Sequence, residues 1–509
     1  MGFNSFTFIL AFLPILLIGW HLLNRAELFR IADVFLIGLS LYFYYSFGVS
    51  FLVILLVSIA VNFCLSAVME KAPSSKKLLK VIGVLFNLSL LFYFKYLGFF
   101  VDNLNALVGS HLSAREILMP IGISFFTFGQ ISFIVDRANG EAPHYSFIDY
   151  ALYTVYFPKL IQGPIAFHKE MIDQFREKSL RRFDTGTFAK GLMSFIIGLG
   201  KKVILADTLA KSVDYGFHYT YYMDTLTVIA VMLAYAFQIY LDFSGYCDMA
   251  NGVSMMLGFK LPVNFNSPYK ASSAKELWQR WHMTLSRFFI KYVYIPLGGS
   301  RKGKLRTVIN VLIVFVLSGL WHGAGWTYIC WGLMQGLLVV WDDLGIVGVK
   351  PPKSEENSAK PRRYLLREKP LFMVPRAVGN ALTFFMFVVS LVFFRSQDMT
   401  YAIQMFKQFF VWTYPGFLYR TASQLVIAEN YIPRQLFSQL GIAGGETIVY
   451  MATLIILLIV SAFIMTRKNT QELVEETYFS FKTVLGLTIV FVWSFISLSN
   501  VSTFIYFQY

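Results

Sequence analysis

Two histidines lie in segments whose other residues are mostly apolar or aromatic. His322 occurs in "SGLWHGAGW", and His282 ends the sequence "WQRWH". An imidazole titrates near neutral pH, so it can take up and return a proton as a general acid or base. Ionisable residues within membrane segments are functional candidates by default. His322 is therefore either a catalytic base or a structural histidine with buried hydrogen-bond partners, and its residue type alone leaves both interpretations open.

Three glycines, Gly319, Gly323 and Gly325, surround His322. Because glycine has no side chain, another backbone or a substrate can come close to it. Small residues also allow two membrane helices to pack tightly against each other. We expect the glycines to keep a narrow passage open beside His322, with helix packing as the alternative.

Neither a metal nor a nucleotide is indicated. His282 and His322 are 40 residues apart, and no carboxylate sits beside either, so a metal site is not expected. The sequence "GGSRKGKL" (298–305) nearly matches a phosphate loop, but Leu305 stands where Ser or Thr would hold magnesium. We predict a turn that leads into the next membrane span, and no cofactor.

The composition indicates an all-α protein that crosses a membrane many times. Of the 509 residues 56% are hydrophobic and 14% are charged, whereas a soluble domain carries about 25% charge. Apolar runs of about twenty residues are long enough to span a bilayer. We expect about eleven crossings plus re-entrant pieces, with candidate segments at 5–23, 31–47, 50–69, 81–100, 117–135, 148–165, 187–206, 224–243, 246–258, 306–321, 325–345, 376–394, 448–466 and 483–503.

Two of these segments contain helix-breaking residues. Pro120 and Gly122 open the stretch 119–136, and Gly163–Pro164 interrupts "FPKLIQGPIAF". Broken helices at membrane depth are tolerated only where they are buried in protein or line a cavity. They are either ordinary kinks or the walls of an internal chamber.

The net charge is +15, and the positively charged residues are concentrated in loops. In a membrane protein their distribution indicates how the chain is oriented in the membrane. The basic loops 24–30 and 70–80 lie two spans apart, which places both in the cytoplasm and the N-terminus outside. Residues 349–370 are polar, basic and Pro-containing, and predict a flexible cytoplasmic loop. A nucleic-acid partner is not expected, because no basic soluble domain exists to bind it.

Polar residues concentrate between 238 and 306. Gln238, Asp242 and Ser244 interrupt an apolar segment, and a carboxylate there must face the protein interior and find a partner. From Lys260 to Arg306 ten Lys or Arg accompany one acid, Glu276. This basic segment fits either lipid headgroups or an anionic acyl donor.

A helical apolar stripe runs through the same segment. Its members recur at three- and four-residue spacing, with basic residues on the other side, which predicts one interfacial helix on the cytoplasmic side. The stripe comprises Leu277, Trp281, Leu285, Phe288 and Phe289, and the basic side comprises Arg280, Arg287 and Lys291.

Four sequences together resemble the membrane-bound O-acyltransferases: "ELWQRWHMTLSRFFIKYVYIPLGG", "SGLWHGAGWTYICWG", "MPIGISFFTFGQISFIVD" and "QIYLDFSGYCDMA". The likeness is strongest to the bacterial branch that O-acetylates alginate or peptidoglycan, and weaker to the D-alanyl transfer proteins. It implies one membrane domain over residues 1–509, with a catalytic core at 118–345. Its fold would be a ring of helices around a thin centre that carries a tunnel.

The resemblance also implies roles for residues. The buried histidine of the family falls on His322, and its second histidine falls on His282. We further predict that positions around them bind the donor or line the tunnel, namely Trp278, Arg280, Trp281, Asp242, Ser244, Gln238, Asn264 and Trp321.

The implied activity moves an acetyl group across the bacterial cytoplasmic membrane. The donor would be a cytoplasmic thioester, acetyl-CoA, and the final acceptor an extracytoplasmic polysaccharide, alginate or peptidoglycan. An extracytoplasmic SGNH-like acetyltransferase would be the partner that delivers the group, and membrane lipids would surround the protein. The rival interpretations are a transporter or flippase, although no duplicated half is evident, and a structural subunit of a glycan export complex.

The C-terminal sequence "STFIYFQY" resembles a motif on related proteins in which a tyrosine is thought to carry the acyl group. On that analogy Tyr506, in the tail 504–509, is a candidate acyl carrier. A phenol with a pKa near 10 is a better leaving group than a sugar hydroxyl, so its ester stays activated. The alternative is an aromatic anchor at the membrane interface.

Overall fold

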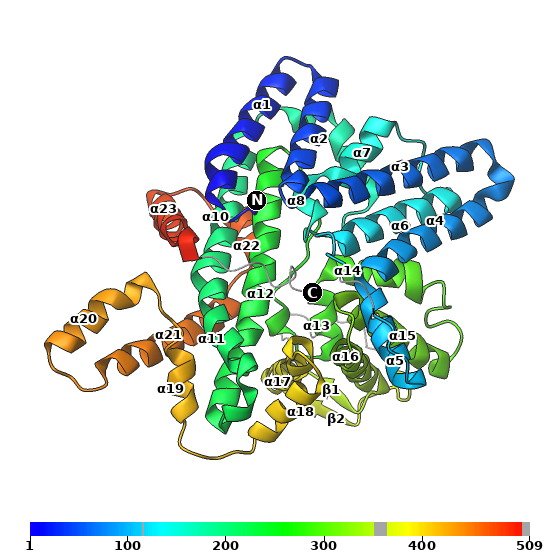
Figure 1. Cartoon of the computed structure of the whole chain (residues 1–509). Helices are drawn as coiled ribbons and strands as arrows, with labels where there is room; N and C mark the ends of the chain where they lie inside the picture. Colours follow the sequence, from blue (N-terminus) through cyan, green and yellow to red (C-terminus); the bar gives the residue numbers. More distant parts are fainter. Residues whose placement is uncertain (114–116, 351–363, 501–509) are drawn as a thin grey trace. The chain divides into compact units, whose positions relative to one another are not determined.

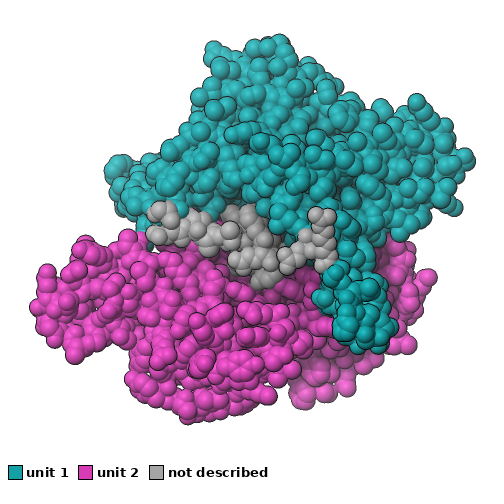
Figure 2. Space-filling view, viewed as in Figure 1, with its two compact units in different colours: residues 1–199, 246–263, 474–498 teal, residues 200–245, 264–473, 499–509 magenta. Residues whose placement is uncertain are grey.

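The computed structural model describes residues 1–113, 117–350 and 364–500. Contacts divide the chain into two compact units, which are coloured teal and magenta in Figure 2. Unit 1 comprises residues 1–199, 246–263 and 474–498, and unit 2 comprises residues 200–245, 264–473 and 499–509. Residues 118–345, predicted as the catalytic core, contribute to both.

Unit 1 is helical. Its first half pairs α1 with α2, and both α3 and α4 pack on α6, so that these three lie side by side (Figure 1). The helices are α1 (Leu13–Arg25), α2 (Phe29–Tyr45), α3 (Val49–Lys71), α4 (Lys76–Leu91), α5 (Leu97–Val108), α6 (Ile123–Asn139), α7 (Phe147–Val155), α8 (Phe157–Leu160), α9 (His168–Arg176), α10 (Thr185–Gly200) and α23 (Phe481–Ile496). Two further helices, α12 (Thr225–Met256) and α22 (Thr470–Glu476), contribute to both units.

The predicted helix breaks in unit 1 are confirmed, and they lie against each other. Gly122 has a left-handed φ of +76° at the start of α6, and the helix then runs through Gly129 without interruption. A Cβ at Gly122 would lie 2.8 Å from the carbonyl oxygen of Leu160, where the second broken segment begins. Only glycine allows this close approach. The two broken segments therefore contact each other through their backbones at this point.

Buried polar side chains in unit 1 are paired across helices. Asn62 on α3 and Asn87 on α4 exchange amide hydrogen bonds of 3.2 and 2.7 Å, and both are fully buried. His168, which no sequence motif marks, is also buried. Its Nδ1 lies 2.9 Å from the Tyr145 hydroxyl and its Nε2 lies 3.2 Å from an Asp136 oxygen. These interactions connect segments that have no proximity in sequence.

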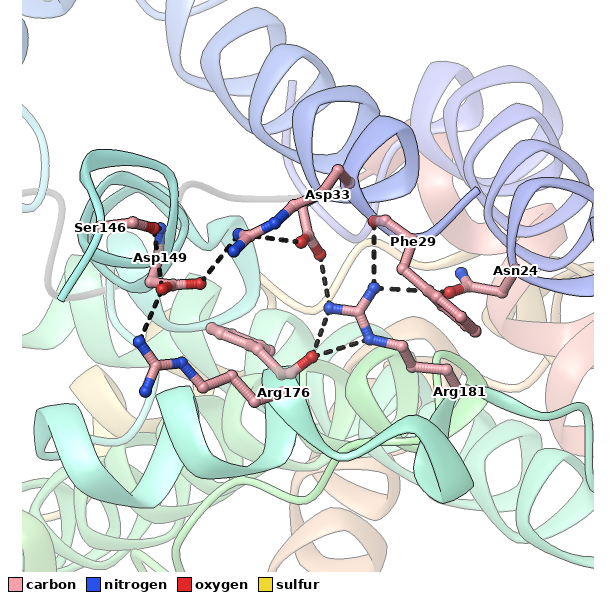
Figure 3. Close-up of polar contacts among 9 residues, drawn as sticks. Asn24, Phe29, Asp33, Ser146, Asp149, Arg176 and Arg181 are labelled. Carbon is pink, nitrogen blue, oxygen red and sulfur yellow. Dashed lines mark hydrogen bonds and ion pairs between the residues drawn. The ribbon is translucent and has the colours of Figure 1, made fainter. Parts of the chain in front are cut away.

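Arg181 is the centre of an ion network shown in Figure 3. Its guanidinium is buried, forms an ion pair of 2.5 Å with Asp33, and donates to the carbonyl oxygens of Phe29 and Phe175. A second carboxylate, Asp149, binds Arg176 at 2.7 Å and Arg30 at 3.3 Å. The network therefore joins the α1–α2 turn to α7 and α9.

Unit 2 is built around a helical hairpin. α15 and α16 pack along much of their length, α17 packs on α16, and α13 packs on α16. The described helices are α11 (Asp207–His218), α13 (Ala274–Arg280), α14 (Met283–Phe289), α15 (Lys304–His322), α16 (Trp326–Leu344), α17 (Arg376–Arg395), α18 (Met399–Gln408), α19 (Gly416–Ala422), α20 (Tyr431–Gln439) and α21 (Gly445–Thr466). A π-helical segment, η5 (Lys201–Ala206), precedes α11.

The strictly all-α prediction needs one small correction. The strands β1 (Val347–Val349) and β2 (Phe372–Val374) form a parallel pair with Gly348 opposite Met373. They border the predicted loop 349–370, of which residues 351–363 lie outside the described residues. The protein is otherwise helical in the part of the chain that the structure describes.

The multi-span prediction is confirmed. Among the described residues seven helical stretches are long and apolar enough to cross a membrane: Phe8–Arg25, Val49–Lys71, Pro73–Val108, Thr225–Met256, Lys304–His322, Arg376–Arg395 and Gly445–Thr466. The shorter apolar helix Phe481–Ile496 accompanies them. The predicted total of about eleven crossings stays a prediction.

The two spans predicted at 224–243 and 246–258 are wrong as separate elements. They form one continuous helix of 32 residues, α12. Gly245 does not break it, because each glycine costs a helix interior only about 1 kcal/mol. Gln238, Asp242 and Ser244 therefore lie inside a largely buried helix and not between two helices.

We predict that Arg181→Met destabilises the protein by about 3–5 kcal/mol, because Asp33 would lose its closest ion-pair partner while staying buried. Thermal unfolding of the detergent-solubilised full chain measures the effect. Arg182→Met is the matched control, because the neighbouring Arg182 is exposed. Equal unfolding midpoints for the two variants would contradict the prediction.

Candidate active site

His282 lies at a break between two short helices. The side chain of Ser273 caps α13 by accepting from the backbone N–H of Glu276, and α13 ends at Arg280. His282 then takes a left-handed backbone conformation, with φ +43°, before α14 begins. The prediction of one continuous interfacial helix is therefore wrong, although its apolar stripe is buried as expected. A left-handed residue other than glycine is strained, and such strain concentrates at functional sites.

A loop beginning at Asn264 holds this break in place. The backbone N–H of Met283 donates to the Asn264 carbonyl over 2.9 Å, and the N–H of Asn266 donates to the Arg280 carbonyl over 2.9 Å. The side-chain oxygen of Asn264 lies 3.1 Å from Nδ1 of His282. These bonds fix both the backbone turn and the plane of the imidazole.

His322 is placed by a different element. It is the last residue of α15, and the N–H of Gly323 closes the helix on the carbonyl of Gly319. Both histidines are buried, with exposed fractions of 0% for His282 and 3% for His322. Their ring centroids are 6.4 Å apart.

Aromatic rings surround the histidine pair. Trp321, Trp331 and Phe394 lie 4.9, 5.1 and 5.1 Å from the His322 ring, and Phe243 and Trp321 lie 4.8 and 5.7 Å from the His282 ring. These rings exclude water and lower the local dielectric, which strengthens any electrostatic interaction within the site. We call the two histidines and these four rings, Phe243, Trp321, Trp331 and Phe394, the histidine enclosure.

Burial keeps His282 neutral. Desolvation lowers the pKa of His282 to about 3, because the charged imidazolium would lose its hydration among aromatic rings. At neutral pH its ring therefore carries one proton and one nitrogen lone pair. Such a ring can accept a proton or a hydrogen bond from a substrate.

The glycines around His322 serve helix packing. A Cβ at Gly319 would collide with the carbonyl oxygen of Tyr328, and one at Gly323 would collide with the Tyr328 ring. On α16, a Cβ at Gly332 would collide with the carbonyl oxygen of Phe315. The expectation of a passage kept open by these glycines is wrong for Gly319 and Gly323. Their function is to let the backbones of α15 and α16 approach each other.

The predicted tryptophans lie at or behind the enclosure. Trp278 packs 5.8 Å from Trp331 and donates through Nε1 to Gln335 over 3.1 Å. Gln335 in turn donates to Ser390 over 2.6 Å. Trp281 is buried against Phe265 and Phe387, at 5.2 and 5.1 Å, in the packing that supports the His282 turn.

Asp242 is an ion-pair residue. Its carboxylate pairs with Lys202 of η5, and Lys202 also lies 2.8 Å from Asp207. All three side chains are buried. Gln238 and Ser244 are buried on the same helix, α12. The requirement for a partner was predictable from sequence, but Lys202 and Asp207 were missed because nothing local marks them as the partners.

Two of the ten basic residues in the segment 260–306 pair with carboxylates. Lys275 pairs with Asp343 at 2.7 Å, and Arg280 pairs with Glu276 at 2.9 Å. Arg280 is therefore held in a salt bridge. Four exposed basic residues, Arg301, Lys302, Lys304 and Arg306, gather at the start of α15. The turn predicted for 298–305 is confirmed, with left-handed φ values at Gly298 and Gly299.

The family comparison covers the segment that contains the two histidines. The model of the membrane-bound O-acyltransferase family matches residues 39–354, which contain both histidines and the whole of α12 to α16. The chain belongs to the membrane-bound O-acyltransferase family. It is an acyltransferase and a multi-pass membrane protein.

Curated relatives of this O-acyltransferase are bacterial. The peptidoglycan O-acetyltransferase of Helicobacter pylori is 36% identical over 433 residues, which cover 80% of this chain and 79% of that protein. The probable alginate O-acetylase of Pseudomonas aeruginosa is 36% identical over 422 residues, covering 81% and 75%. The teichoic acid D-alanyltransferase of Streptococcus thermophilus is 26% identical over 299 residues, covering 55% and 69%.

Of the predicted site residues, the structure brings His282, His322, Trp321 and Asn264 together, with Trp278 and Trp281 behind them. Tyr506 lies outside the described residues. The aromatic members Phe243, Trp331 and Phe394 were missed in the sequence. No motif identifies them, because phenylalanine and tryptophan are common throughout the spans.

We predict that Gly319→Ala destabilises the α15–α16 hairpin by about 1–3 kcal/mol, because the added methyl group must displace the Tyr328 carbonyl. Acyl transfer should fall with it, since His322 ends the displaced helix. Gly38→Ala is the control: it is a helical glycine with no atom within 4 Å of the added Cβ. Unfolding midpoints and activity that match the wild type in Gly319→Ala would refute the packing role.

Proposed function

We propose that this acyltransferase transfers an acetyl group from acetyl-CoA for O-acetylation of an extracytoplasmic polysaccharide, alginate or peptidoglycan. The observation that supports the proposal most is a pair of buried histidines in an aromatic enclosure, in a chain 36% identical to a peptidoglycan O-acetyltransferase. The identity is the same to probable alginate O-acetylases, so the choice between the two polysaccharides is left to experiment.

The reaction needs a base in a site that excludes water. As the acceptor oxygen bonds to the thioester carbonyl carbon, its O–H bond breaks and a base takes the proton. The C–S bond then breaks, and the same proton passes to the leaving sulfur, so that a thiol and an oxygen ester are formed. We assign the base to the histidine pair, with His322 as the primary candidate. Exclusion of water by the enclosure protects the thioester from hydrolysis.

We further propose that the donor enters from the cytoplasm and the acceptor from the other side, through a tunnel inside a ring of helices. The exposed cluster Arg301, Lys302, Lys304 and Arg306 spans the start of α15, whose other end carries His322. Cations at that end of the helix suit an anionic nucleotide such as CoA, and suit lipid headgroups equally well.

The acceptor path requires a carrier and a partner. We propose that Tyr506 receives the acetyl group and that an extracytoplasmic SGNH-like acetyltransferase passes it to the polysaccharide. The protein would lie in the bacterial cytoplasmic membrane with residues 24–30 and 70–80 in the cytoplasm, where the positive-inside rule places them.

We expect His322→Ala to lower acetyl transfer by about 10²–10⁴-fold, the usual contribution of a general base. Release of free CoA from acetyl-CoA by the full chain in nanodiscs, together with polysaccharide O-acetyl content in cells, measures it. His218→Ala is the matched control, because His218 is exposed at the end of α11. A His322→Ala variant that folds and acetylates normally would exclude the catalytic role.

For Tyr506 we expect an acetyl group on the C-terminal peptide when the downstream transferase is absent. Mass spectrometry of that peptide from such a strain detects the added mass. Tyr506→Phe should abolish both the modification and polysaccharide acetylation, since it removes the phenolic oxygen. Full activity in Tyr506→Phe with no acetylated peptide in the wild type would rule out the carrier.

A further inference from the structure

The side-chain oxygen of Asn264 can be identified from its neighbours. The backbone N–H of Thr284 points at this atom over 3.3 Å, and the Thr284 hydroxyl lies 2.9 Å from it. A backbone N–H can only donate, so the atom facing it must be the amide oxygen and not the amide nitrogen. The orientation of the Asn264 amide is therefore fixed by the backbone of α14.

That orientation fixes the protonation of His282. Nδ1 of His282 lies 3.1 Å from the same Asn264 oxygen, and an oxygen acceptor requires a donor opposite it. Nδ1 must therefore carry the single proton of the neutral ring. The other nitrogen, Nε2, is left with its lone pair, and it is buried with no hydrogen-bond partner among the residues that the structure describes.

We propose that Asn264 is a positioning residue that holds His282 as the Nδ1–H tautomer, so that Nε2 accepts a hydrogen bond from a donor group of the substrate. This inference rests on the proposed function. The donor group is either the hydroxyl that is acetylated or an amide N–H on the arm of the thioester. In this tautomer His282 cannot donate to the oxyanion of the tetrahedral intermediate, because Nε2 carries no proton.

The backbone and the side chain of Asn264 have separate roles. The backbone of Asn264 alone anchors Met283, so the turn needs no particular side chain for that bond. The side-chain oxygen, in contrast, faces His282 from an Asn whose amide is fully buried. A buried Nε2 without a hydrogen-bond partner carries a desolvation penalty. A substrate group that donates a hydrogen bond to Nε2 removes that penalty. The Nδ1–H tautomer therefore favours binding of a substrate that has such a donor.

The first test is Asn264→Asp in the full chain in nanodiscs. The carboxylate keeps an oxygen opposite Nδ1 but raises the pKa of His282, so that Nε2 becomes protonated as the pH falls. We expect kcat/KM for CoA release from acetyl-CoA to fall at least tenfold between pH 8 and pH 5, relative to the wild-type profile. Of the described rings packed on His282, those of Phe243, Phe265, Trp321 and His322, only His322 can titrate, and it is present in both proteins. An unchanged pH profile would contradict the proposal.

The second test, Asn264→Leu, removes the oxygen and frees the tautomer. We expect kcat/KM for acetyl-CoA to fall at least tenfold. S-phenyl thioacetate, which has no N–H, separates the two sources of the donor group. If the group is the thioester's amide, the penalty appears in KM for acetyl-CoA and vanishes with S-phenyl thioacetate. If it is the acceptor hydroxyl, the penalty appears in kcat and persists with both. Wild-type kcat/KM for both donors in a folded variant would overturn the proposal.

A direct measurement determines the tautomer in the wild-type protein itself. Solid-state ¹⁵N NMR of histidine-labelled wild-type protein in lipid, with His282→Gln to assign the signal, reports which nitrogen is protonated. We expect an Nδ1–H, unprotonated Nε2 pattern at pH 7, and a protonated Nε2 would overturn the assignment. If wild-type protein releases no CoA from acetyl-CoA, the proposed function fails, whereas this tautomer result still decides the role of Asn264.

Discussion

The structure depends on one constraint: a polar group within apolar helices must find its hydrogen-bond or charge partner inside the protein. Lys202 between Asp207 and Asp242 is the most demanding case, because three charged groups are buried together. Removing one charge from such a cluster leaves another uncompensated in a low dielectric, so the pairing restricts which elements can pack together. In this protein the Lys202 ion pairs join η5 and the start of α11 to α12. In unit 1 the amides of Asn62 and Asn87 join α3 to α4 by the same principle.

The same constraint explains the histidine enclosure. A neutral imidazole has one donor and one acceptor, and the structure supplies an acceptor for His282 from Asn264. Aromatic rings occupy the remaining contacts and provide apolar packing around both imidazoles. The site therefore contains few polar atoms, and these are buried among aromatic rings. That is the environment in which a weak base has its greatest effect on a reacting group.

The sequence predicted the class of fold and the histidines but not how they meet. Apolar runs of about twenty residues identified most of the long helices, since hydropathy depends only on local composition. The turn at Trp281–His282 escaped prediction because neither residue is a glycine or proline, and its left-handed backbone depends on bonds from Asn264 and Asn266. The partners Lys202 and Asp242 are 40 residues apart, and no local pattern relates them.

The role of the glycines beside His322, Gly319 and Gly323, could not be predicted from the local sequence. The two glycines of "GLWHG" carry no side chain, which is equally consistent with a cavity and with a close helix contact. The choice depends on what lies opposite, and α16 presents its own glycine, Gly332, at that point. The opposite error occurs at α12, where a break was predicted near Gly245 but the helix is continuous.

The two histidines are held by independent means, and this bears on catalysis. His322 is fixed by backbone-to-backbone packing of α15 on α16, and such packing leaves little freedom for the helix end. His282 is fixed by a strained turn and by hydrogen bonds from a loop. Reacting atoms must be held to within a few tenths of an ångström, and an error of 1 Å can cost about 10²-fold in rate. A rigid hairpin on one side and a hydrogen-bonded turn on the other define the distance between two imidazoles without any bond between them. The strain at His282 then has a purpose, because a relaxed helix through residues 274–289 would turn its ring away from the Asn264 oxygen.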